Sequence, residues 1–153
     1  MIEGTAKAGA SWGRFKFTWT GLIVLLALVG VVAAVAYPSY GDYTNRAQAS
    51  EAISLISGAK TPLAEYFEDR KKWPTRLEEV FGITSGKYTQ SVMITRGAGG
   101  TGEIEVTATM RADSVVRSLR GKSILMLSSD GGKNWICKPG TMEPKNLPAA
   151  CRN

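Results

Sequence analysis

A continuous apolar run and a periodic region behind it occupy the first half of the chain. The run covers residues 17–41 and carries no charged side chain, and it exceeds the ~20 residues that a membrane-spanning helix needs. In residues 42–67 the apolar side chains recur at helical spacing along one face, at Ala49, Ala52, Ile53, Ile56, Ala59, Leu63, Tyr66 and Phe67. We therefore expect a long helix with an apolar first half and an amphipathic second half.

Glycines and prolines within these regions predict local features of the helix. Gly30 is small enough to let a neighbouring helix approach closely, and Pro38 is expected to bend the helix because it lacks a backbone donor. Gly58 and Pro62 predict a slight bend without a stop. We expect the pair Trp73-Pro74 to end the helix.

The second half of the chain has the pattern of short strands joined by turns. Strand character is found in residues 88–95, 103–110, 123–128 and 134–137, and the second of these alternates apolar and polar residues. The glycine-rich segments 97–102 and 130–132 predict turns between antiparallel strands. The expected fold class is α+β, with a long N-terminal helix packed on an antiparallel sheet of about four strands.

Charges around the apolar run predict the orientation and the domains of the chain. Lys7, Arg14 and Lys16 precede the run, and Asp42 is the first charge after it. Because positive flanks remain cytoplasmic, we expect a basic cytoplasmic leader at 1–16, a transmembrane segment at 17–41 and an extracytoplasmic domain at 42–153. A signal peptide cleaved near 34–36 is the alternative.

Composition argues against several kinds of chemistry. The chain has no histidine and two cysteines, so zinc ligation and Cys–His or Ser–His catalysis lack their parts. Gly121-Lys122-Ser123 resembles the end of a phosphate-binding loop, but the glycine required five residues earlier is replaced by Val116. We therefore expect no catalytic, cofactor-binding or metal-binding residues.

Cys137 and Cys151 predict a disulfide that closes a short loop. An exported domain favours oxidation of such a pair, and a loop of this size contributes ~3 kcal/mol in the chain-entropy model. Two reduced, buried thiols are the alternative, which would fit only a cytosolic chain.

The net charge of +6 is concentrated toward the C-terminus, where eight Lys or Arg residues stand against three acidic ones from Val106 onward. A basic surface of this kind can attract polyanions, although it also serves solubility. The candidates for polyanion contact are Arg117, Arg120, Lys122, Lys133 and Lys138.

Several ordered segments resemble the type IV pilin family. They are residues 33–40, which look like the membrane-exit segment, then 42–44, 46–48, 50–66, 135–137 and 145–152. The last two look like the closing strand and the disulfide-bounded loop of major pilins. The resemblance implies a filament subunit that is held first in the bacterial inner membrane with a periplasmic domain and then, if processed, in a surface pilus.

The same resemblance draws attention to the start of the apolar run. In the family, a peptidase cuts after a glycine and exposes a phenylalanine, which is then N-methylated. Here that phenylalanine is Phe17, and the residue before it is Lys16. The family's glutamate, four residues further on, is replaced by Gly21.

Two functions follow from these observations. The first is a structural subunit of a type IV pilus, with other pilins and the assembly machinery as partners and with adhesion, twitching motility or DNA uptake as its use. The second is an uncleaved, membrane-anchored protein that binds pilins or nucleic acid and modulates assembly. A cleaved minor pilin that captures DNA through the basic C-terminal region lies between them. DNA and a host surface are further candidate partners of the chain.

Overall fold

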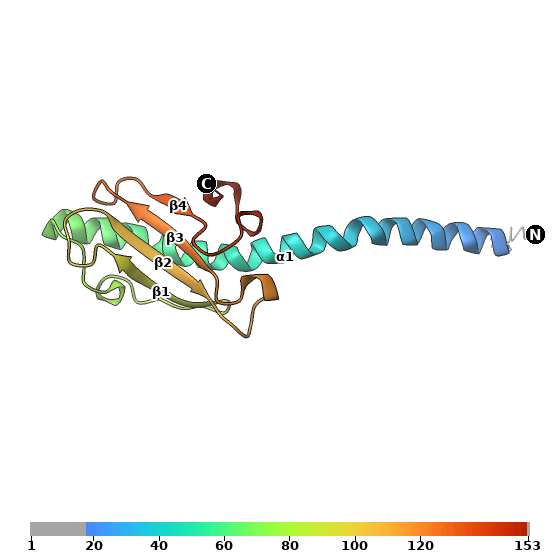
Figure 1. Cartoon of the computed structure of the whole chain (residues 1–153), viewed down its shortest axis with the longest axis horizontal. Coiled ribbons are helices and arrows are strands. Elements are labelled where there is room, and N and C mark those ends of the chain that lie inside the picture. The colour runs from blue at the N-terminus through green and yellow to red at the C-terminus, as the bar shows by residue number, and fades with distance from the viewer. Residues whose placement is uncertain (1–17, 153) are drawn as a thin grey trace, which may run out of the picture. The chain divides into compact units, whose positions relative to one another are not determined.

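The computed structural model describes residues 18–152, except for the side chains of residues 37–39. The chain contains two compact units, Met1–Tyr37 and Pro38–Asn153. The helix α1 (Trp19–Arg70) supplies the described part of the first unit and also enters the second. Within the second unit, the sheet lies against the C-terminal half of this helix (Figure 1).

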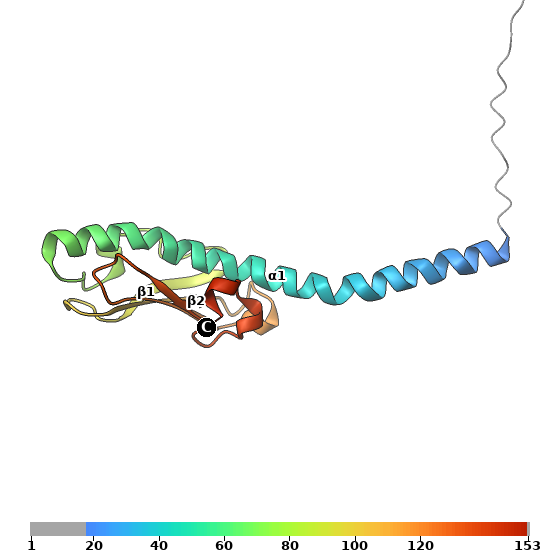
Figure 2. The same ribbon diagram turned by 90° about the horizontal axis from the view of Figure 1, so that it is seen from above.

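The sheet has four antiparallel strands, as predicted, and they lie in the sheet in the order of the sequence. The strands are β1 (Thr89–Arg96), β2 (Ile104–Met110), β3 (Ser123–Ser128) and β4 (Ile136–Lys138). Each follows its neighbour through a turn or a short connection, so all strand pairs are local in sequence. Helix and sheet form two layers, which Figure 2 shows from above.

The predicted fourth strand begins two residues too early. Asn134 is engaged in the turn, where its backbone N–H and its side-chain amide both donate to the carboxylate of Asp130. Pairing with β3 therefore starts at Ile136, opposite Leu127, and continues to Lys138. The other three predicted strands differ from the observed ones by at most one residue at either end.

The core lies between the predicted apolar face of the helix and one face of the sheet. Ala49, Ala52, Ile56, Ala59 and Leu63 are almost completely buried. They pack in one cluster with the inward residues of the central strands, which are Ile104, Val106, Ala108, Met110, Ile124 and Met126. Alternation along β2 and β3 thus matches helical spacing along α1, and both patterns bury the same core.

The helix ends at Arg70, three residues before the predicted stop at Trp73-Pro74. Lys71 takes a left-handed conformation (φ 55°) and donates its backbone N–H to the carbonyl of Phe67. This is the usual geometry of a helix C-terminus, although glycine is more common there. Gly58 and Pro62 do not stop the helix, as predicted.

Trp73 anchors the end of the helix to the β1–β2 turn. Its backbone N–H donates to the carbonyl of Gly100 at 2.7 Å, and its indole Nε1–H donates to the carbonyl of Gly102 at 2.7 Å. The ring lies 4.4 Å from that of Phe67 and 6.3 Å from that of Trp135. Only 1% of Trp73 is exposed, so a single side chain joins the helix and both hairpins.

Replacing Trp73 with alanine is expected to lower the free energy of unfolding of the globular domain by about 3–5 kcal/mol, because it empties a large buried site. Urea unfolding of the full chain in detergent, followed by near-ultraviolet circular dichroism, measures this. Ile83→Ala is the control, since Ile83 is 63% exposed. Equal midpoints for the two variants would contradict the anchoring role.

Candidate functional site

The first half of α1 exposes its apolar side chains all around. Residues 18–36 are exposed except for Leu22, which is half-buried. The helix is long and apolar enough to cross a membrane, by length and composition. A helix that is hydrophobic on every side needs an apolar environment. Within the described residues of this unit, the rest of the chain does not supply such an apolar environment.

The helix begins with a capping residue of its own. Thr18 precedes α1, and its Oγ1 accepts the backbone N–H of Gly21 at 3.4 Å. This satisfies one of the four donors that a helix N-terminus leaves free. Lys16 and Phe17, the predicted processing residues, lie outside the described residues.

Gly30 and Pro38 both lie within the helix. A Cβ atom built at Gly30 meets no other atom within 4 Å, so this side of the helix is open to a neighbouring molecule. The backbone remains helical through Pro38, and the bend expected there stays a prediction.

Three polar side chains on the second half of the helix hold distant loops. Asn45 Nδ2 donates to Oδ1 of the buried Asn146 at 3.0 Å. Gln48 Oε1 accepts the backbone N–H of Val116 at 2.9 Å. Further along, Glu51 accepts two backbone N–H groups at the start of β1, from Tyr88 at 2.8 Å and from Thr89 at 3.0 Å.

These three residues recur every three positions beside the buried alanines of the same helix. Each therefore borders the core, where it can reach a loop that crosses the edge of the sheet. We call this set, Asn45, Gln48 and Glu51, the polar clip. It fixes the loop before β1, the β2–β3 connection and the C-terminal loop at one end of the globular domain.

Cys137 and Cys151 form the predicted disulfide. It links β4 to the short 3₁₀ helix η4 (Ala149–Cys151) and encloses a second one, η3 (Pro144–Asn146). Asn146 lies inside this loop, so the disulfide and the contact with Asn45 hold the loop from two sides. In the same loop, Thr141 Oγ1 accepts a hydrogen bond from the backbone N–H of Ser123.

The candidate polyanion-binding residues fall into separate places. Arg117 is the first residue of the 3₁₀ helix η2 (Arg117–Leu119), and Arg120 directly follows this helix. Lys122 lies in the same β2–β3 connection. Lys133 lies in the β3–β4 turn, at the opposite end of β3, and Lys138 ends β4. The structure therefore brings three of the five together on one connection.

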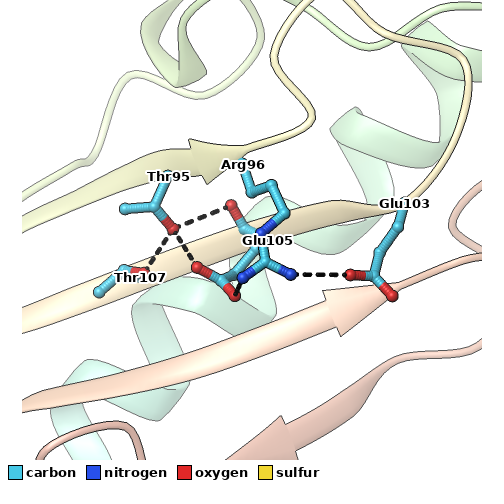
Figure 3. A network of polar contacts seen from close by, with 5 residues as sticks. All are labelled: Thr95, Arg96, Glu103, Glu105 and Thr107. Atoms are coloured by element: carbon cyan, nitrogen blue, oxygen red, sulfur yellow. Dashed lines mark hydrogen bonds and ion pairs between the residues drawn. The ribbon is translucent and has the colours of Figure 1, made fainter.

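The far end of the sheet carries a network of charged and hydroxyl side chains (Figure 3). Arg96 pairs with Glu103 at 3.3 Å and with Glu105 at 3.4 Å. Thr95 donates to Glu105 at 2.7 Å and lies 2.7 Å from the hydroxyl of Thr107. Exposed ion pairs contribute little energy, so this network chiefly fixes how β1 and β2 meet at the irregularity between Ile94 and Arg96.

The neighbouring β3–β4 turn is held by Asp130. Hydrogen bonds from the backbone and side-chain amides of Asn134, and then from the hydroxyl of Ser128, lower the pKa of Asp130 to about 2. Both carboxylate oxygens of Asp130 thus accept hydrogen bonds within the turn. Among the described residues, no group of three or more Cys, Asp or Glu side chains is arranged to hold a metal ion.

Comparison with known proteins decides the family. Residues 45–152 match the Pilin family, described as a bacterial filament family. The chain belongs to the pilin family. It is 36% identical to the fimbrial protein EcpC of Eikenella corrodens, over 90% of each chain. It is 33% identical to the type IV major pilin protein PilE of Neisseria gonorrhoeae, over 90% of this chain and 93% of that one.

The predicted family and fold are thereby confirmed, and this pilin is a structural subunit of a pilus. It assembles with other pilin subunits, and its location is the membrane or the pilus surface. The relatives are fimbrial and pilin proteins by name, which describes structural proteins and not enzymes.

Sequence reasoning missed the cap at Thr18 and the polar clip. Thr18 precedes the helix as a capping residue should, which was a usable signal. The spacing of 45, 48 and 51 along the border of the apolar face was also visible. Their partners were not, because those lie 101, 68 and 37 residues away in sequence.

Replacing Glu51 with alanine leaves two backbone N–H groups of this pilin without their acceptor. The expected loss in the free energy of unfolding is about 1–3 kcal/mol. Glu51→Gln keeps an acceptor oxygen and is expected to recover most of the loss. Urea unfolding of both variants measures this, and equal losses would show that charge, not the hydrogen bonds, matters.

Replacing Cys151 with serine is expected to destabilise the globular domain by about 3 kcal/mol, because the unfolded chain is no longer cross-linked. Membrane insertion, which depends on the apolar half of α1, should be unchanged. Proteolysis of the inserted protein, with and without reductant, tests both points. Equal resistance of the parent and the variant in both conditions would refute the role of the disulfide.

Proposed function

We propose that this pilin polymerises into a type IV pilus through the apolar half of α1. In the filament, this segment would pack against the same segment of neighbouring subunits, and the globular domain would form the surface. One observation carries the proposal, which is the full exposure of residues 23–36 in the isolated chain. Such a surface must be covered either by lipid or by other copies of itself.

Before assembly, lipid is the covering. We propose that α1 crosses the bacterial inner membrane, with the globular domain in the periplasm and with the pilus assembly machinery as its partner. The disulfide between Cys137 and Cys151 supports an oxidising compartment for that domain. The basic residues before the span, Lys7, Arg14 and Lys16, support a cytoplasmic N-terminus.

A membrane-retained form that modulates assembly is the second candidate, and the first turn of α1 favours it. Within the described residues 19–22, no acidic side chain is present. In the family, the glutamate at this place is thought to neutralise the terminal amine of a neighbouring subunit. An uncleaved leader would create no such amine at Phe17, and a buried, unpaired carboxylate would be costly.

The intact mass of the protein separates the two candidates. It should be measured in the membrane fraction and in filaments sheared from the cell surface. The pilus-subunit proposal expects the chain in the sheared filaments, and a mass beginning at Phe17 would show that Lys16 and Gly21 are tolerated. A full-length species confined to the membrane would refute it and support the second candidate.

Gly30→Leu tests the packing surface directly. The added side chain is apolar and meets no atom of the same chain, so membrane insertion and domain stability should not change. Between packed helices, overpacking by such a substitution costs about 1–3 kcal/mol, so the amount of sheared filament is expected to fall about tenfold.

Val31→Leu is the matched control, because it also enlarges an exposed apolar residue of the same helix but replaces no glycine. Immunoblots of the membrane and sheared fractions measure both variants. Normal filament yield for Gly30→Leu would show that this side of the helix does not pack against neighbours.

A further inference from the structure

One end of the globular domain carries a high density of positive charge. It consists of the segments 42–48, 83–88, 111–122 and 138–152, which together hold nine basic and three acidic residues, a net charge of +6. We call these segments the basic collar. Its basic residues are Arg46, Lys87, Arg111, Arg117, Arg120, Lys122, Lys138, Lys145 and Arg152. The rest of residues 38–152 holds seven basic and nine acidic residues, a net charge of −2.

The polar clip determines where the collar lies. Gln48 holds the β2–β3 connection, Asn45 holds the C-terminal loop, and Glu51 holds the start of β1. All three belong to the first turns of α1 beyond residue 43. Within the second unit, the collar therefore lies beside the part of α1 that follows residue 43, where these three side chains hold its loops.

Three basic side chains of the collar are held by contacts within it. Arg120 and Arg152 donate their Nε–H groups to the backbone carbonyls of Val115 and Leu147. The Glu143 carboxylate accepts a hydrogen bond from Lys145 at 2.8 Å and raises the pKa of Lys145, and the charge of Asp42 acts in the same direction. The hydrogen bond from Asn45 to Asn146 holds the C-terminal loop at this part of the helix, three residues beyond Asp42, the first charged residue after the apolar run.

Exposed aromatic residues mark where the membrane surface falls on the helix. Trp19 is 83% exposed, and Tyr40 and Tyr43 are each 74% exposed. Trp19 and Tyr40 are roughly 21 residues apart, a helical rise of about 31 Å, which matches the ~30 Å hydrocarbon core of a bilayer. Tryptophan and tyrosine concentrate at both membrane interfaces. Tyr40 and Tyr43 therefore belong at headgroup level, where Tyr40 precedes the collar segment 42–48 and Tyr43 is part of it.

We propose that the basic collar binds anionic phospholipid headgroups around the exit of α1 and so holds the globular domain at the bilayer until the subunit enters a filament. The inference rests on the proposed function, because it needs a membrane-inserted subunit. Arginine side chains suit this partner, since the guanidinium binds phosphate through two parallel hydrogen bonds. Each basic residue near an anionic leaflet strengthens attachment by about fivefold.

Nucleic acid is the competing polyanion, and the position of the charge argues against it. A duplex that reached the collar would have to lie on the membrane surface, where anionic lipids repel it. Lys133, at the far end of the domain, is the candidate residue that a nucleic acid could reach freely, and it lies among acidic neighbours such as Glu68 and Asp130.

The experiment compares full-length protein in nanodiscs of neutral phosphatidylcholine with nanodiscs that also contain phosphatidylglycerol. Hydrogen–deuterium exchange is followed by mass spectrometry in residues 111–122 and 138–152. The collar peptides are expected to exchange at least about fivefold more slowly in the anionic nanodiscs. The difference should vanish in about 1 M salt, where the Debye length falls to about 3 Å.

A matched pair of variants locates the effect. Arg117→Gln, Arg120→Gln and Lys122→Gln together should abolish the lipid-dependent slowing in residues 138–152. Lys72→Gln, Arg76→Gln and Lys133→Gln remove the same charge from exposed residues elsewhere on the domain and should leave it intact. Unchanged circular dichroism confirms that both triple variants are folded.

Three results would overturn the inference. They are equal exchange of the parent protein in the two nanodiscs, equal effects of the two triple variants, and slowing by short duplex DNA in neutral nanodiscs without slowing by phosphatidylglycerol. The last would assign the collar to nucleic acid. None of them touches the pilus-subunit proposal, which sheared filaments test separately.

Discussion

The fold depends on one face of α1 having side chains small enough for the sheet to pack closely against the helix. Ala49, Ala52 and Ala59 present no bulk beyond a methyl group, and all three are completely buried. Ile56 and Leu63, between and beyond them, enter the sheet's inner layer. Without this close approach, the polar side chains beside the alanines could not reach the loops that they hold. Packing of apolar atoms thus sets the distance at which the hydrogen bonds of Asn45, Gln48 and Glu51 become possible.

Different kinds of interaction stabilise the two ends of the domain. At the far end, Trp73 supplies a large buried surface and two hydrogen bonds to the β1–β2 turn. At the end beside the apolar run, alanines provide little apolar area, and side-chain hydrogen bonds and a disulfide fasten the loops instead. Loops held this way can carry many charges at the surface, because their anchors are polar groups near the helix. That construction is compatible with the concentration of basic residues at this end.

The sequence predicted those parts of the fold that depend on local pattern. The apolar run, the amphipathic face from Ala49 to Leu63 and the alternation in β2 each reflect the period of a single element. Errors occurred where a neighbouring residue redirected the chain. Lys71 turned left-handed and ended the helix early, and Asn134 joined the turn at Asp130 and delayed β4.

The candidate site was less predictable for a related reason. The partners of Asn45, Gln48 and Glu51 are distant in sequence, so no window of the chain contains both halves of any of these contacts. The charged residues could be counted but not placed, and Lys133 proved to lie at the opposite end of β3 from Arg117, Arg120 and Lys122. The pairing of Cys137 with Cys151 needed no such knowledge, since two cysteines in an exported domain allow one intramolecular bond.

Moving a subunit from membrane to filament exchanges one apolar environment for another. Lipid tails are as apolar as leucine, so burial of residues 23–36 against neighbours gains little hydrophobic free energy over lipid. The balance must then be set by smaller terms, which are close packing at residues such as Gly30 and the electrostatics of the groups at the two membrane surfaces. At one surface this chain has Gly21 where an acidic residue would draw a neighbour's amine. At the other, the proposed contact of the collar, whose net charge is +6, with anionic lipid would have to be given up or replaced by a contact with anionic groups of another subunit. Both features favour the membrane, so assembly of this pilin would require correspondingly better packing in the filament core or work from the assembly machinery.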